Sequence, residues 1–426
     1  MNYHQINRFF ALLVITLCLL IQPIIGIGFS DVKDIDLPEP GMIEVSIDEV
    51  IQKRTSIRDF TDEPLDFNDL STILFHAYGM RDDGSFTIPS FQGDYAVVIY
   101  VLMQDAIYRY DPYNHSLVFY KTGDYRDIGQ YSAPVQLGIC WNHLKNNDEN
   151  IVGMQIGAVG QNIYHSCVAM GLGTVATAEV PTLLDTIGLP EHHKGRIVMP
   201  LGHPSVEAKY LFLPMYLSFL PKVSDSTVSY TSTLLDWNLL TQLSHDKLTK
   251  EKINQFLWAC YGYSYYLDHT GFETHFIERH RSVPSAHGYY PLEIFMMSNQ
   301  GVYWYIPGLR NNDPFGLPIV TFLLKRSRDD VRASIAEVTD QSIADSPVSF
   351  VISLNIKDTI DWDDLSEPSL RWVWTYEAGA CVQNVLLDCC GWGYSTRIIP
   401  LQNHSEVISI LKLNESFDPF VIVSIG

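Results

Sequence analysis

Residues 156–174 read IGAVGQNIYHSCVAMGLGT, and residues 378–396 read AGACVQNVLLDCCGWGYST. The two stretches share a Gln-Asn pair and a final threonine at a constant offset of 396 − 174 = 222 residues. Each is long and apolar with small residues along one stripe, a pattern typical of a helix that packs closely against another helix. We therefore expect these two helices to form a mutual interface, and we expect the elements around them to be repeated as well.

Shorter matches flank the two helices in the same order. ILFHAYG at 73–79 resembles FLWACYG at 256–262, and each reads as an apolar helix that ends at a glycine. Further matches pair IPSFQGDYAVVIYV from Ile88 with VPSAHGYYPLEIFM from Val283, strand Tyr108–Tyr110 with Tyr303–Tyr305, and IVMPLG at 197–202 with VIVSIG at 421–426. Five colinear matches predict one unit used twice, with helices and strands mixed in each copy.

The repeat sets the predicted domain organisation. The first domain spans 41–216, a Ser-, Thr- and Pro-containing linker spans 217–232, and the second domain spans 233–426. The chain carries 28 Lys+Arg against 49 Asp+Glu, a formal charge of −21. Such a field repels phosphate backbones, which excludes nucleic acid as an expected partner.

The N-terminal segment 1–40 contains the apolar run FFALLVITLCLLIQPIIGIGF at residues 9–29, preceded by Arg8 and followed by acidic residues. A run of this length is long enough to cross a bilayer as a helix, and the charge asymmetry would leave the bulk of the chain outside the cytoplasm. The segment predicts an N-terminal apolar helix that is either an export signal or a membrane anchor. We expect an exported or membrane-anchored protein.

The cysteines give no sign of a metal centre. Six of the seven lie beyond the N-terminal run, and they show neither a Cys-x-x-Cys motif nor another metal-ligand spacing. No metal site is predicted. We expect these cysteines to be small core residues, with one or two disulfides as an open alternative in an oxidising compartment.

Read in order, the motifs resemble the nitroreductase family of flavin enzymes. The first copy contributes RTSIRDF at 54–60, the helix end at Gly79, the Pro89-Ser90 turn, the Gln-Asn helix with GLGT at 171–174, and MPLG at 199–202. RSVPSAH at 281–287 with YPLE at 290–293 in the second copy resembles the branch that includes azoline-oxidising dehydrogenases. The resemblance implies an α+β fold that dimerises and holds two FMN molecules at the dimer interface. A tandem chain would then be a monomer that forms this pseudo-dimer within itself.

In such dimers, the resemblance implies that the Arg-x-Ser-x-Arg motif of one copy binds the flavin phosphate and the Pro-Ser turn of the other copy contacts the same flavin. The 183-residue offset (262 − 79) places Trp237, Leu239 and Thr241 where the first copy has Arg54, Ser56 and Arg58. A phosphate needs charge-assisted donors, which Trp and Leu cannot supply. The second copy is therefore expected to have a degenerate phosphate clamp.

The Pro-Ser turn of the first copy also departs from the motif, because Phe86 stands opposite Arg281. From these complementary losses we expect one composite flavin site per chain. The first copy is expected to provide Arg54, Ser56, Arg58, Gly171, Gly173 and Lys209, and the second copy Arg281, Pro284, Ser285, Ala286 and His287. Simpler roles stay open for several of them: surface ion pairs for the two arginines of the motif, a turn histidine for His287, and a helix end for the two glycines.

The resemblance implies an oxidoreductase that passes hydride or electrons through FMN to or from a small organic substrate, with NAD(P)H as a candidate electron donor. No catalytic acid or base is identified by the sequence. Because nicotinamide cofactors are scarce outside cells, the predicted export keeps an alternative open: a non-catalytic, degenerate flavin- or ligand-binding module.

Overall fold

The computed structural model describes residues 33–91, 94–177, 184–206, 209–211, 216–218, 220, 223–239, 248–268, 278–308, 319–359, 371–402 and 404–426. Residues Asp34–Gly426 form one compact unit. The predicted apolar helix at residues 9–29 lies outside the described residues. Within the described ranges, every helix is too short or too polar to span a bilayer.

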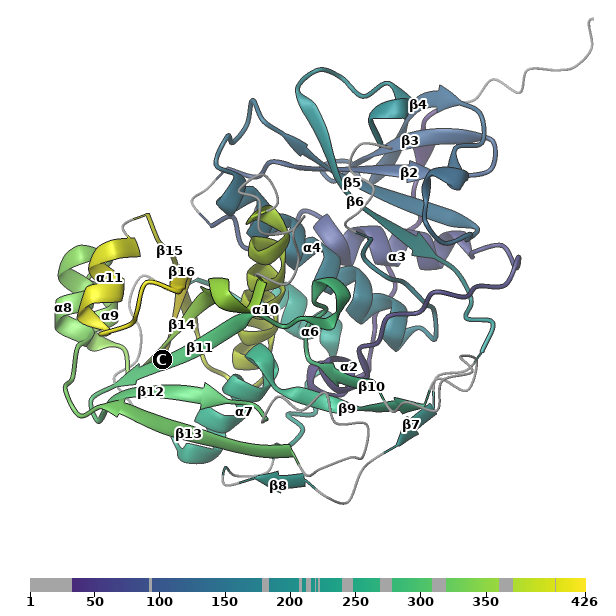
Figure 1. Ribbon diagram of the computed structural model, residues 1–426. Coiled ribbons are helices and arrows are strands. Elements are labelled where there is room, and N and C mark those ends of the chain that lie inside the picture. Colours follow the sequence, from purple (N-terminus) through teal and green to yellow (C-terminus); the bar gives the residue numbers. More distant parts are fainter. Residues whose placement is uncertain are drawn as a thin grey trace, which may run out of the picture. The chain divides into compact units, whose positions relative to one another are not determined.

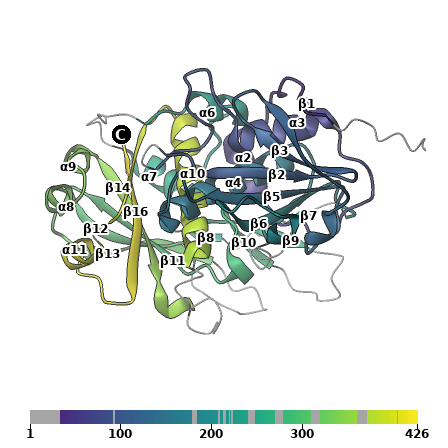
Figure 2. The same ribbon diagram turned by 90° about the horizontal axis from the view of Figure 1, so that it is seen from above.

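Two long helices lie between the two large sheets of this unit (Figures 1 and 2). They are α4 (Glu149–Ala169) and α10 (Arg371–Gly391), the two Gln-Asn helices of the sequence repeat. At their contact, a Cβ atom on Gly157 would lie 1.9 Å from the carbonyl oxygen of Tyr376, and one on Gly379 would lie 2.0 Å from that of Met154. Because no side chain fits in those gaps, glycine at both positions allows the two backbones to touch. The expected helix interface is present.

The first large sheet has six strands in the order β1-β4-β3-β2-β5-β6, and all its pairs are antiparallel. Its strands are β1 (Ile35–Asp36), β2 (Val97–Leu102), β3 (Ala106–Asp111), β4 (Ser116–Thr122), β5 (Val135–Asn142) and β6 (His193–Leu201). Short 3-10 turns η1 (Arg126–Ile128) and η2 (Asp185–Ile187) lie between strands, and helices α2 (Ile47–Lys53) and α3 (Phe67–Tyr78) precede the sheet.

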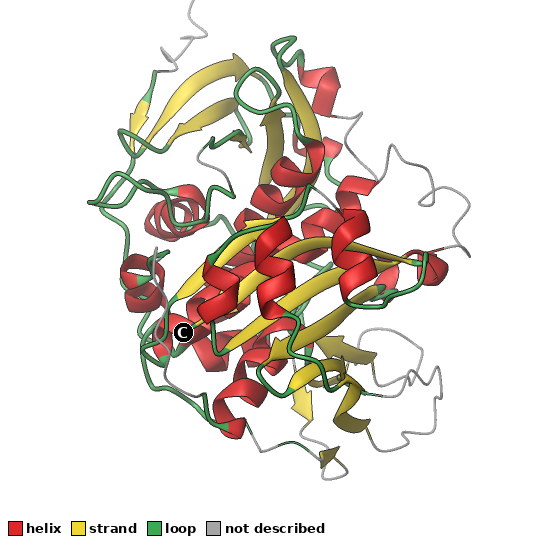
Figure 3. Cartoon of the chain, turned by 90° about the vertical axis from the view of Figure 1, so that its left-hand side faces the viewer, coloured by secondary structure: helices red, strands yellow, loops and turns green. Residues whose placement is uncertain are grey.

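The second large sheet has the order β15-β16-β14-β11-β12-β13-β8. Its strands are β8 (Tyr216–Ser218), β11 (Leu292–Ser298), β12 (Gly301–Ile306), β13 (Ile319–Ser327), β14 (Val348–Asn355), β15 (Thr396–Pro400) and β16 (Phe417–Ile425). One face is covered by α8 (Arg332–Val338), α9 (Ser342–Asp345) and α11 (His404–Ile410), as Figure 3 shows. Apolar side chains such as Phe295 of the sheet, Ile335 of α8 and Val407 of α11 form the core between them.

A third, smaller sheet joins β7 (Lys209–Leu211), β9 (Tyr263–Asp268) and β10 (Glu278–Arg281). The helices α6 (Tyr230–Asp236) and α7 (Lys250–Tyr261) precede β9, while the 3-10 turns η3 (Ala286–Gly288) and η4 (Ile356–Thr359) follow β10 and β14. Helix α6 begins inside the range 217–232 that the sequence assigns to a linker.

We call residues 34–211 the first half and residues 223–426 the second half. The helices of the two halves correspond at the predicted spacing. Helices α2 and α6 have the same length and begin 230 − 47 = 183 residues apart, and the same holds for α3 and α7. The halves also meet in a reciprocal contact: the N–H of Ile47 donates to the carbonyl of Val228, and the N–H of Tyr230 donates to that of Val45.

A buried polar cluster ties the two long helices to each other. The Nε2 of Gln161 donates to the Oδ1 of Asn384 at 2.9 Å, and the Nε2 of Gln383 donates to the Oδ1 of Asn162 at 3.0 Å. Each asparagine also donates its Nδ2 to a helix-end carbonyl of its own half, Asn162 to His76 and Asn384 to Ala259. Since all four side chains are fully buried, these bonds fix one register of the two helices.

A second buried cluster holds two carboxyl groups. The Nε2 of Gln255 on α7 donates to the Oδ1 of Asp48 at 2.5 Å and lies 3.4 Å from the Oδ1 of Asp388 on α10. The N–H and hydroxyl of Ser226 also donate to Asp48. Burial, and then the charge of Asp48, raise the pKa of Asp388 well above its ordinary value of 3.8. Asp388 therefore holds its proton to a higher pH in the folded protein than an exposed carboxyl group does.

From the raised pKa of Asp388 beside Asp48, we predict that the free energy of unfolding decreases at high pH. A carboxyl whose pKa is raised by folding contributes stability that is complete below pH 3.8 and declines as the pH rises toward the folded pKa, by about 1.4 kcal/mol per pH unit. Asp388→Asn keeps the shape without the charge, so its urea midpoint should vary less with pH and exceed that of the wild type at pH 8. Urea denaturation from pH 5 to 9 measures this, and parallel curves for the two proteins would contradict it.

Candidate functional site

A cavity of about 260 Å³ lies where the two halves meet. The first half lines it with Ser56, Arg58, Gln130, Tyr131, Tyr164, Val175, Ala176, Thr177 and Ile197, and the second half with Pro284, Ser285, Ala286, His287, Trp372, Val373 and Tyr376. Six of the eleven residues predicted from the sequence are therefore brought together around one cavity.

The RTSIRDF loop follows helix α2 and supplies the polar side of the cavity. The hydroxyls of Ser56 and Tyr164 lie 3.1 Å apart, and the N–H of Ala176 donates to the Tyr164 hydroxyl at 2.8 Å. Arg58 is half-buried and places one Nη 3.4 Å from the carbonyl of Ser56. No Asp or Glu occurs among the described residues that line the cavity, and Arg58 is their one Lys or Arg. The site is thus locally basic in an acidic chain.

Arg54 lies behind this wall and does not line the cavity. Its side chain is almost fully buried, with the guanidinium carbon 5.2 Å from the centre of the Tyr164 ring. Its Nε and one Nη donate to the carbonyl of Arg281 at 3.4 and 3.2 Å. The other Nη is buried and has no hydrogen-bond partner among the described residues. A buried guanidinium donor without a partner is costly, and it suits a site that takes up an anionic group.

Arg281 turns its side chain away from the cavity. The guanidinium lies 4.3 Å from the ring centre of Tyr261, 4.8 Å from that of Tyr290 and 5.1 Å from that of Tyr263. Burial by itself lowers the pKa of Arg281, but the tyrosines around it outweigh this and raise the pKa above its usual range. The carbonyl of Arg281, rather than its side chain, reaches Arg54. A direct contact between Arg281 and the flavin stays a prediction.

The two predicted glycines also lie outside the lining. Gly171 has a positive φ of 73° at the end of α4, as a helix-ending glycine does. Gly173 pairs with Gly202, and a Cβ on it would lie 2.7 Å from Ile57, so it lets the RTSIRDF loop pack against the strand end. Lys209 begins β7 and pairs with Asp268 of β9, and its side chain lies outside what the structure describes.

Sequence reasoning missed the aromatic part of the wall. Tyr164 and Tyr376 lie on the two long helices, where their spacing resembles that of ordinary core residues. A signal was nevertheless present, since the 222-residue offset places Leu386 opposite Tyr164 and Met154 opposite Tyr376. A hydroxyl that one copy has and the other lacks marks a site-specific residue. The Tyr376 hydroxyl is buried without a partner among the described residues.

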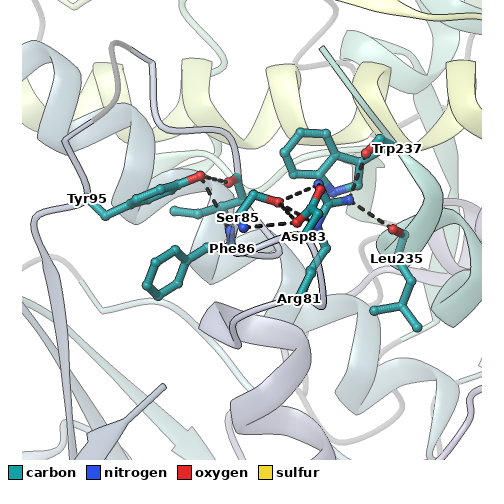
Figure 4. A network of polar contacts seen from close by, with 8 residues as sticks. Arg81, Asp83, Ser85, Phe86, Tyr95, Leu235 and Trp237 are labelled. Carbon is teal, nitrogen blue, oxygen red and sulfur yellow. Dashed lines mark hydrogen bonds and ion pairs between the residues drawn. The ribbon is translucent and has the colours of Figure 1, made fainter. Parts of the chain in front are cut away.

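Figure 4 shows the contacts of Arg81 beside Trp237 in the equivalent region of the other half. A cavity of about 180 Å³ lies there, and its lining includes Trp237, Leu386 and Ser395. Trp237 follows α6 as Arg54 follows α2, and the Arg81 guanidinium stacks on the Trp237 ring at 4.1 Å. One Nη of Arg81 donates to the carbonyls of Leu235 at 3.0 Å and Trp237 at 2.7 Å. Its other nitrogens bind Asp83 and Ser85. This region therefore offers no guanidinium donor to a ligand, as far as the described residues extend.

The sequence of the chain is similar to known nitroreductases. Residues 51–203 match the profile of the nitroreductase family. A protein of Methanocaldococcus jannaschii that is named as a nitroreductase is 32% identical over 169 residues, which are 34% of this chain and 84% of that protein. The chain therefore belongs to the nitroreductase family. It is a flavin-dependent oxidoreductase at the level of that family.

Solved structures extend the likeness to both halves. A crystal structure of a nitroreductase-like protein from Anabaena variabilis has a TM-score of 0.64 and 13% identity, and the match covers 93% of each chain. This shows that the whole α+β fold, both large sheets included, occurs in another protein. A nitroreductase-like protein from Desulfovibrio desulfuricans, solved in complex with FMN, has a TM-score of 0.31 and 22% identity over 40% of this chain and 92% of its own.

The packing of Arg81 predicts a structural role for this residue. Arg81→Ala removes both carbonyl bonds and the stacking on Trp237, and should lower the free energy of unfolding by roughly 2–4 kcal/mol. Arg58→Ala is the matched control, because Arg58 is half-buried and should change stability by no more than about 0.5 kcal/mol. Urea denaturation compares them, and equal losses in the two variants would show that Arg81 does not brace this region.

Proposed function

We propose that this chain is an FMN-dependent oxidoreductase with one composite flavin site per chain, formed by two tandem copies of a nitroreductase unit. The observation that carries the proposal is the cavity that takes one wall from each half. Its basic side comes from the RTSIRDF loop of the first half, and its other wall comes from the Pro-Ser turn of the second. The counterpart region has Trp237 and Arg81 in place of a clamp. The matched element spacing supports the duplication.

The residues present fit a flavin phosphate. Ser56 and Arg58 line the cavity, and Arg54 has a buried Nη without a partner in the described structure. Two guanidinium groups and a hydroxyl are donors that an anionic phosphate prefers. No carboxylate occurs among the described lining residues, so none of them stands in direct contact with an anion bound in the cavity, although the chain's overall charge is −21.

The remaining lining residues shape a site for a planar molecule and a small organic substrate. Tyr131, Trp372 and Tyr376 offer apolar surface that excludes water, and residues 175–177 of the first half also line the cavity. When bound, FMN supplies hydride and electron transfer. The protein contributes the position and polarity of the site, and we assign no proton-transfer role to any side chain. NAD(P)H is the proposed electron donor.

Flavin titration tests the composite site. The purified protein should bind one FMN per chain, and Arg58→Ala should weaken binding about 10- to 100-fold, because a hydrogen bond to a charged group contributes roughly 1.5–3 kcal/mol. Arg54→Ala should abolish retention. Trp237→Phe is the matched control on the other side, since it keeps a ring for Arg81 and removes an indole N–H that is unpaired among the described residues.

The outcomes are distinct. Two FMN per chain, or equal weakening in Arg58→Ala and Trp237→Phe, would overturn the single composite site. Colourless protein that cannot be reconstituted with FMN would favour a ligand-binding module without redox activity.

A further inference from the structure

The second-half wall of the cavity is a backbone segment in an unfavourable conformation. His287 and Tyr290 have φ angles of 50° and 51°, in the left-handed region that non-glycine residues rarely adopt. Gly288 between them has φ 73°. Ordered residues with such angles persist only where neighbouring groups hold them in place. A group packed against this wall must therefore stabilise it.

Glu377 on α10 lies directly behind the wall and is almost fully buried. Its Oε2 accepts a hydrogen bond from the Ser285 hydroxyl at 2.6 Å, and its Oε1 accepts one from the Tyr261 hydroxyl. Because each of these hydroxyls also accepts a backbone N–H, from Tyr290 at 2.9 Å and from Leu292 at 3.1 Å, their protons point to Glu377. An ionised carboxylate matches two such donors. The two bonds brace both ends of residues 285–292.

The same network reaches the phosphate side of the site. The rings of Tyr261 and Tyr290 enclose the Arg281 guanidinium, and the N–H of Arg281 donates to the Tyr290 hydroxyl at 3.3 Å. The Arg281 carbonyl in turn orients Arg54 through two hydrogen bonds. Glu377 is thus connected, through Tyr261, Tyr290 and Arg281, to the buried guanidinium of the first half.

The equivalent position in the other half shows that the charge is specific to this wall. The 222-residue offset pairs Glu377 with Gln155. Gln155 donates its Nε2 to the carbonyls of Ser90 at 2.7 Å and Asp94 at 2.6 Å, and accepts from the N–H of Ala96 at 3.0 Å. A neutral amide therefore braces the counterpart loop through its main chain. At this position, the carboxylate belongs to the half whose Pro284–His287 segment lines the cavity of about 260 Å³.

We propose that Glu377 is a positioning residue of the flavin site: its buried carboxylate holds residues 285–292, with the left-handed His287, Gly288 and Tyr290, in place and sets the local charge that the bound flavin experiences. This rests on the proposed function. A negative charge one side chain behind the wall disfavours the more anionic, reduced form of the cofactor and keeps its reduction potential low.

Hydrogen exchange of the flavin-free protein tests the bracing. Glu377→Ala should speed exchange of the Tyr290 and Leu292 amides at least tenfold, because both depend on hydroxyls that Glu377 orients. Gln155→Ala is the matched control: it should speed exchange at Ala96 and leave residues 285–292 within twofold of the wild type. Unchanged exchange at 285–292 in Glu377→Ala would overturn the proposal.

Redox titration of the FMN-loaded protein tests the charge. Glu377→Gln keeps the size and removes the charge, so the ratio of affinities for reduced over oxidised FMN should rise about tenfold, which is a potential about 30 mV more positive. A merely structural role would leave the potential unchanged, and that result would also overturn the proposal. If the wild type binds no FMN, the proposed function fails, while the exchange experiment still decides whether Glu377 braces the wall.

Discussion

The direct contact of two helix backbones, α4 on α10, is the constraint on which the rest of this structure depends. Gly157 and Gly379 let each helix touch a carbonyl of the other, and four buried amide side chains allow only one register. Once that register is set, residues at equivalent positions of the two helices face equivalent regions on opposite sides of the contact. The contact between the helices therefore determines the position of the cavity-lining residues Trp372, Val373 and Tyr376 on α10.

The contact is nearly symmetric, whereas the regions on its two sides are not. Arg54, Tyr164 and Glu377 on one side correspond to Trp237, Leu386 and Gln155 on the other. Each substitution removes a charge or a hydroxyl from the second region, and Arg81 brings a guanidinium there that is fully used by carbonyls, Asp83 and Ser85. A nearly symmetric scaffold thus carries one cavity lined by Arg58 and one smaller cavity beside the Arg81–Trp237 stack. The backbone determines where the two equivalent regions lie, and a few side chains determine how their linings differ.

The repeated elements and much of the site could be predicted from the sequence, because offsets between similar stretches are preserved in the fold. The helix pairs α2 with α6 and α3 with α7 follow the 183-residue spacing, and six predicted residues line one cavity. The role of Arg281 could not be predicted in the same way. Its side chain is directed by three tyrosines from two separate segments, and a motif read along the chain contains no information on which atom, carbonyl or guanidinium, faces the site. Glu377 was overlooked for a related reason, since a buried acid within an apolar helix gives no periodic signal.

The asymmetry itself follows from covalent linkage, if the two halves are the tandem copies that we propose. In a homodimer of identical chains, every substitution appears at both equivalent positions, so replacing the clamp arginine by tryptophan would remove both phosphate sites together. In one chain, position 54 and position 237 vary independently. The second region was then free to exchange ligand-binding groups for packing, and the Arg81–Trp237 stack supplies stabilising contacts that an open cavity lacks. The two regions therefore differ in a few side chains around one shared helix pair: Arg54 and Tyr164 on one side, Trp237 and Leu386 on the other.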